Sequence, residues 1–152
     1  MGAEARIKEL KLQLPNPPKP VATYIPAVQV GNLLFVSGHG PLKTDGTMIA
    51  GKVGSEATLE QGKEAARVTG LAILSTMRNT LGSLDRVVRL IKVLGMVNAT
   101  PDFREHPQVI NGFSDLMVEV FGESGKGARS AVGMGSLPGN ISVEVEAIFE
   151  VH

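Results

Sequence analysis

The sequence contains no cysteine and no tryptophan, and aromatic residues make up only 4% of it. Without cysteine there can be no disulfide bond, no thiolate metal site and no cysteine nucleophile. The scarcity of aromatic side chains leaves little of the stacking surface on which single-stranded nucleic acid binds. A cysteine-free chain is compatible with a reducing compartment, and we expect a cytoplasmic protein.

An excess of charge of one sign is also missing, because 15 Lys and Arg residues balance 15 Asp and Glu residues. Nucleic acids and anionic membranes attract proteins mainly through a basic excess, so neither partner is expected. Zero net charge does not exclude a small anionic ligand, because such a ligand needs only one local positive group. No apolar run approaches the roughly 20 residues that cross a membrane. The N-terminal stretch "MGAEARIKELKLQL" also lacks the unbroken apolar run of a secretory signal.

The length of 152 residues predicts a single domain over residues 1–152, which buries roughly 70% of its unfolded surface. Five of the nine prolines lie in "LPNPPKPVATYIP", which predicts an extended arm on the surface. Residues 1–20 form an N-terminal arm in this interpretation. Within it, residues 4–14 could form a short helix or a strand.

Local signals predict the first half of the domain. Gly31-Asn32 separates two β-rich runs in "AVQVGNLLFVSG" and predicts a hairpin. The turn-rich stretch that follows leaves room for a short strand near 47–49. Thr58 and Gln61 form a capping box, which predicts a helix from there to about Leu81, ended by Gly82.

The second half predicts a central strand over 87–99, a helix from Pro107 to Gly122, and a pair of strands at about 129–135 and 141–151. The order ββ(β)αβαββ is typical of an α+β fold with two helices on one sheet face. In the last strand, apolar residues alternate with Glu144, Glu146, Ile148 and Glu150. The helices cannot cover both faces, so we expect another subunit to cover part of the second one.

Arg129 begins the first strand of this final pair, and it has three interpretations. It could be an exposed charge, a structural partner of Glu144 or Glu146 on the return strand, or an anchor for a substrate carboxylate. The guanidinium fork matches a carboxylate in bidentate fashion. Composition alone favours the first two interpretations, because isolated arginines are usually solvated. Whether the two glutamates share the face of Arg129 depends on the turn between the strands.

Other motifs are weaker. "GTMIAGKV" is close to a phosphate-binding loop but has Val53 where a Mg²⁺-ligating hydroxyl is needed. The three histidines are scattered, so no metal site is expected. His39 follows a strand end beside glycines, where small-ligand sites gather, although an exposed turn histidine is the commoner outcome.

Three motifs, "SGHGP", "VINGF" and "ARSAVGMGSLPGNISVEVEAI", together resemble the reactive intermediate deaminase family (RidA, also YjgF) over about residues 21–151. The resemblance implies a chorismate-mutase-like α+β sandwich with one mixed sheet, assembled into homotrimers with ligand clefts between subunits. Characterised deaminases of this family hydrolyse reactive enamines and imines, such as 2-aminoacrylate and 2-iminopropanoate, to 2-keto acids and ammonia. They use no cofactor.

Carried over by position, the resemblance implies that Arg129 holds the substrate carboxylate and Glu144 positions the attacking water. The same positions imply a substrate-binding set, which is Tyr24, Ser37, His39, Asn111 and Arg129. His39 stands where the family often has glutamine. Ala131 stands where it often has cysteine, which leaves the substrate open.

The sequence therefore predicts an enamine/imine deaminase that acts on small 2-imino acids. The first alternative is a non-catalytic protein that binds keto acids in the same cleft, since Arg129 and Glu144 would serve both functions. The second is an endoribonuclease. Zero net charge and few aromatic residues argue against that activity.

Overall fold

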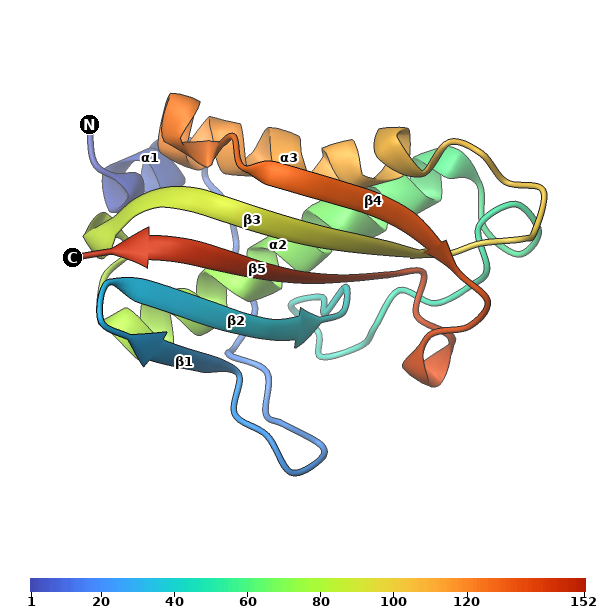
Figure 1. Ribbon diagram of the computed structural model, residues 1–152, viewed down its shortest axis with the longest axis horizontal. Coiled ribbons are helices and arrows are strands. Elements are labelled where there is room, and N and C mark those ends of the chain that lie inside the picture. The colour runs from blue at the N-terminus through green and yellow to red at the C-terminus, as the bar shows by residue number, and fades with distance from the viewer.

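The computed structural model describes residues 1–152 and contains one five-stranded sheet in the order β1-β2-β5-β3-β4 (Figure 1). The strands are β1 (Ala27–Val30), β2 (Leu33–His39), β3 (Val87–Asn98), β4 (Ala128–Met134) and β5 (Val143–Val151). The helices are α1 (Ala3–Glu9), α2 (Leu59–Leu81) and α3 (His106–Phe121). Strands β3 and β4 are parallel and the other pairs antiparallel, so the sheet is mixed and the fold is α+β, as predicted.

Local sequence signals explain the ends of the elements. The β1–β2 hairpin turns at Gly31, whose φ of +61° favours glycine. The capping box of Thr58 and Gln61 begins α2 as predicted, with both reciprocal hydrogen bonds present. Gly82, at φ +84°, ends the helix and donates its N–H to the Arg78 carbonyl.

Helices α2 and α3 cover one face of the sheet side by side (Figure 1), and the core lies between the two layers. The alternation of buried and more exposed residues predicted for the last strand is confirmed in β5. Its buried apolar residues are Val143, Val145, Ala147, Phe149 and Val151. Close packing depends on two glycines. A Cβ atom at Gly112 would overlap the Lys63 carbonyl of α2, and one at Gly95 of β3 would overlap Ile110.

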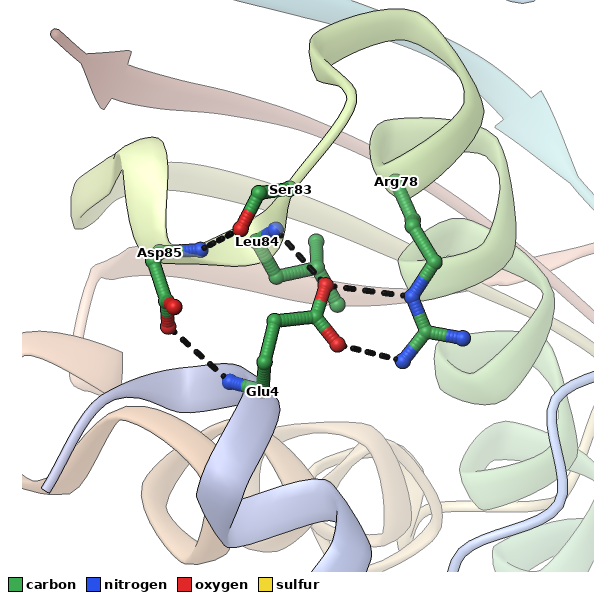
Figure 2. A network of polar contacts seen from close by, with 5 residues as sticks. All are labelled: Glu4, Arg78, Ser83, Leu84 and Asp85. Atoms are coloured by element: carbon green, nitrogen blue, oxygen red, sulfur yellow. Dashed lines mark hydrogen bonds and ion pairs between the residues drawn. The ribbon is translucent and has the colours of Figure 1, made fainter.

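The N-terminal arm begins as a helix, which settles the alternative left open by the sequence. The Glu4 carboxylate accepts hydrogen bonds from Arg78 Nε at 3.1 Å, Arg78 Nη2 at 2.7 Å and the Leu84 N–H at 2.9 Å (Figure 2). The Glu4 N–H donates to Asp85 Oδ1 at 3.0 Å. This Glu4 network therefore fastens α1 to the end of α2 and to the turn that leads into β3.

Two sequence predictions about the sheet are wrong. The final strands do not pair, because β3 lies between β4 and β5. The segment between β3 and β4 contains α3 and is long enough to be the crossover that parallel strands need. Strand β4 can therefore pair in parallel with β3 and not with β5. Residues 47–49 form no strand; only isolated bridges occur there, such as Leu42 to Met48.

Candidate functional site

Arg129 lies on β4, at the edge of the sheet, with its side chain toward the helices. It is in register with Val93, which is buried under the helices, and residues in register share a face. Arg129 Nη1 donates to Asn111 Oδ1 at 2.8 Å and to Ser114 Oγ at 3.1 Å, both on α3. A cavity of about 180 Å³ beside it is lined in part by Ser114 and Val118. The guanidinium is therefore half-buried and held by neutral groups.

Glu144 lies on β5, and its side chain points to the opposite face of the sheet. Its neighbours Val143 and Val145 are buried under the helices, so Glu144 takes the uncovered side. Burial raises the pKa of the Glu144 carboxyl, and the nearby Glu146 adds to the shift. A Cβ atom at Gly38 would overlap the carboxylate, so this glycine leaves the space that Glu144 occupies.

Tyr24 and Ser37 each neighbour Gly38, the glycine that lies against the Glu144 carboxylate. Ser37 Oγ donates to the Ile25 carbonyl at 2.7 Å, which ties β2 to the segment that carries Tyr24. Tyr24 is 44% exposed and lines a small cavity of about 110 Å³ together with Gly38. Because Gly38 also contacts Glu144, these three predicted residues gather around one strand end.

The uncovered sheet face around this group is apolar over much of its area. A hollow of about 420 Å³ lies between β1, β2, β3 and β5; its lining includes Val28, Phe35, Ser37, Lys92, Leu94, Glu146 and Ile148. Val28 and Phe35 are more than 40% exposed. Glu146 lines this hollow, and Glu144 lies against Gly38.

The predicted site residues therefore fall into two groups, one on each face of the sheet. Arg129 and Asn111 lie on the helix side, whereas Tyr24, Ser37 and Glu144 lie around the uncovered face. The interpretation of Arg129 as an ion-pair partner of Glu144 or Glu146 of the same chain is wrong, because β3 separates their strands and their side chains point apart. Its interpretation as a fully exposed charge is also wrong.

His39 lines the same small cavity as Tyr24 and Gly38, but its side chain is turned away from Glu144 and lies against α2. The residue is 5% exposed, so the expectation of an exposed turn histidine is wrong. Nδ1 lies 2.6 Å from the Ser37 carbonyl and must donate to it, which leaves Nε2 to accept from the Thr76 hydroxyl at 2.7 Å. Burial lowers the pKa of His39, so the ring is neutral near pH 7. A bulge between Val36 and His39 turns it inward.

Sequence reasoning missed Ser114. The signal was present, since Ser114 follows Asn111 by three positions on one helix and therefore lies on the same face. No cluster of three His, Cys, Asp or Glu side chains could hold a metal ion. None of the helices has the length and apolar character needed to span a membrane.

Comparison with known proteins places this geometry in a family. Residues 4–150 match the family model described as "YjgF/chorismate_mutase-like, putative endoribonuclease". The chain belongs to this family. It is 40% identical over 149 residues to Protein TCP17 of Trypanosoma cruzi, covering 97% of this chain and 93% of that one.

Two further relatives bear on structure and chemistry. A crystal structure from Shewanella oneidensis superposes with a TM-score of 0.94 at 28% identity, covering 99% of this chain and 100% of that chain. A protein of Dermatophagoides farinae named 2-iminobutanoate/2-iminopropanoate deaminase is 29% identical over 142 residues, covering 93% of this chain and 95% of its own. The resemblance read from the three sequence motifs is thereby confirmed at the level of family and fold.

Proposed function

We propose that this protein hydrolyses small, reactive 2-imino acids to 2-keto acids and ammonia. The observation that carries the proposal is Arg129, a half-buried guanidinium that no carboxylate neutralises. Its Nε and Nη2 make no hydrogen bond within the chain, so one edge of the fork is free for a carboxylate. The name of the Dermatophagoides relative supports this class of substrate.

The complete site forms between subunits in this proposal. Arg129 and Glu144 cannot face one small ligand within a single chain, because the sheet separates them. If a neighbouring copy covers the uncovered face, its Arg129 can approach Glu144, Ser37 and Tyr24 of the first copy. The apolar residues of that face, including Phe35 and Ile148, favour such burial. We propose the homotrimer that the family resemblance implies.

The chemistry requires little from the protein. Arg129 binds the carboxylate and places the imine carbon beside a water molecule held by Glu144. Glu144 takes a proton as the water oxygen bonds to that carbon, and it returns this proton to the imine nitrogen to give a carbinolamine. Glu144 then moves the hydroxyl proton of the carbinolamine to its nitrogen, so the C–N bond breaks, ammonia leaves and the C=O bond forms. The raised pKa of Glu144 suits this exchange, since a carboxyl with a pKa nearer neutrality both accepts and returns a proton readily.

A trapping assay tests this activity. An amino-acid oxidase releases the imine, semicarbazide captures it, and a deaminase lowers the yield of semicarbazone. We expect the wild-type protein to lower that yield, and Arg129→Ala to behave like a blank. Arg104→Ala serves as the matched control, because Arg104 is exposed and makes no side-chain hydrogen bond.

The alternatives give different results. A protein that binds pyruvate in calorimetry but never lowers semicarbazone yield is a keto-acid binding protein, and the proposed activity is then wrong. Cleavage of single-stranded RNA that disappears in Arg129→Ala would favour the endoribonuclease. Light scattering checks the assembly, and a stable 16.0 kDa monomer at micromolar concentration would contradict the inter-subunit site.

A further inference from the structure

Arg129 differs from the three arginines of the chain that pair with glutamates in the groups that hold it. Arg6, Arg67 and Arg78 each form an ion pair with a glutamate. Arg129 forms none; its Nη1 directs both hydrogens to neutral oxygens of α3, Asn111 Oδ1 and Ser114 Oγ. A guanidinium held in this way is fixed in position but keeps its full positive charge.

These two hydrogen bonds also select which edge of the guanidinium faces a ligand. Nη1 has only two hydrogens, and both are used. The remaining pair, Nε–H and Nη2–H, points in parallel and matches the two oxygens of one carboxylate. Because Asn111 and Ser114 belong to the same helix, they hold this orientation before any ligand binds.

The cavity beside Arg129 leaves the guanidinium room to turn. Ser114, Val93 and Val118 line about 180 Å³ of space into which the guanidinium could turn. The Ser114 hydroxyl lies at 3.1 Å from Nη1, on the wall of that cavity. Without the hydroxyl, Asn111 alone would hold the group, and rotation about the remaining bond would misalign the free edge.

We propose that Ser114 is a positioning residue, which holds Arg129 so that its Nε–Nη2 edge receives the carboxylate of a 2-imino or 2-keto acid. The proposal rests on the proposed function, because it concerns how the same anchor is oriented. Ser114 acts through Arg129 and does not touch the reacting atoms. Its loss should weaken binding of every ligand that carries this carboxylate and leave the chemical step intact.

Three variants of the full-length protein test the role of Ser114. Ser114→Ala should raise the pyruvate Kd and the KM for 2-iminopropanoate by about 10- to 150-fold, the range expected for losing a hydrogen bond to a charged group. The kcat should stay within about threefold of wild type. Ser114→Thr keeps the hydroxyl and should restore both constants. Ser55→Ala, which removes an exposed loop hydroxyl, should change neither.

A double variant separates positioning from a general structural effect. In an Arg129→Ala background, Ser114→Ala should cause no additional loss of pyruvate affinity, because the hydroxyl then has nothing to orient. Equal pyruvate Kd values for Ser114→Ala and wild type would overturn the proposal. A weaker Kd for Arg129→Ala in the same experiment would show that Arg129 still binds the carboxylate. An additive loss in the double variant would also overturn it. Wild-type protein that neither binds pyruvate nor consumes the imine would instead remove the proposed function.

Discussion

Arg78 and Arg129 show two ways in which this chain holds a half-buried guanidinium. Arg78 meets the Glu4 carboxylate with two parallel hydrogen bonds of 3.1 and 2.7 Å, and the Leu84 N–H completes the Glu4 network (Figure 2). Arg129 meets only the amide oxygen of Asn111 and the hydroxyl of Ser114. The first arrangement neutralises the charge and fastens the arm. The second leaves the charge available, which suits an anion-binding site.

The largest expected effect comes from removing the available charge. Arg129→Ala should lower kcat/KM by about 30- to 5,000-fold, since losing a bidentate contact with a charged group costs roughly 2–5 kcal/mol. Arg129→Lys should recover little, because an ammonium lacks the fork. Both variants should keep the wild-type circular dichroism spectrum. Steady-state kinetics of Arg129→Ala and Arg78→Ala measured side by side checks the comparison. A similar loss of kcat/KM in Arg78→Ala would show that the two arginines do not differ in this way.

Glu144→Gln should lower kcat by about 10²- to 10⁴-fold, the usual contribution of a general base, while pyruvate binding survives. The glutamine cannot accept the proton of the water but does not touch Arg129 in the same chain. The folded-state pKa of Glu144 is raised, so ionisation costs stability as pH rises above about 4.5. The unfolding temperature of the variant at pH 7 should therefore not fall. Calorimetric titration and thermal melts measure both quantities, and lost pyruvate binding would contradict the assignment.

Glu4→Gln should destabilise the fold by about 1–2 kcal/mol near pH 7, a discounted value because the pair is partly exposed. The hydrogen bonds from Arg78 lower the pKa of Glu4. The stabilisation is thus complete above the ordinary pKa of 4.5 and is lost as pH falls toward the lowered value. Urea unfolding at pH 7 and at low pH measures this. The difference in the free energy of unfolding between wild type and Glu4→Gln should shrink at low pH. An equal difference at both pH values would contradict the ion-pair explanation.

The smallest effect concerns His39. Its pKa is lowered by burial, so the unfolded chain binds a proton at a pH where the folded chain does not. Stability should fall as pH drops below about 6.5, the ordinary histidine value. His39→Gln should flatten that part of the profile, because an amide does not titrate. Urea midpoints between pH 7 and 5.5 check this, and parallel profiles would show that His39 contributes nothing to it.

Most helices and strands could be predicted because their signals are local. The capping box of Thr58 and Gln61 and the turn at Gly31 depend on residues within a few positions of one another. The alternation of β5 identified its buried side from the pattern alone. The family resemblance likewise rested on contiguous motifs, and it named Arg129, Glu144 and Asn111 as candidates.

What the sequence could not decide depended on groups that are distant along the chain. Pairing β4 with β5 looked natural because "SLPGN" joins them, but α3 brings β4 back parallel to β3. Because β3 therefore lies between β4 and β5, Arg129 is separated from Glu144 and lies under α3 beside Asn111. The bulge before His39 likewise turned its ring toward Thr76, 37 residues away. Local patterns determine which face of a strand is apolar, whereas the environment of a single charged or polar side chain is decided only when the elements pack.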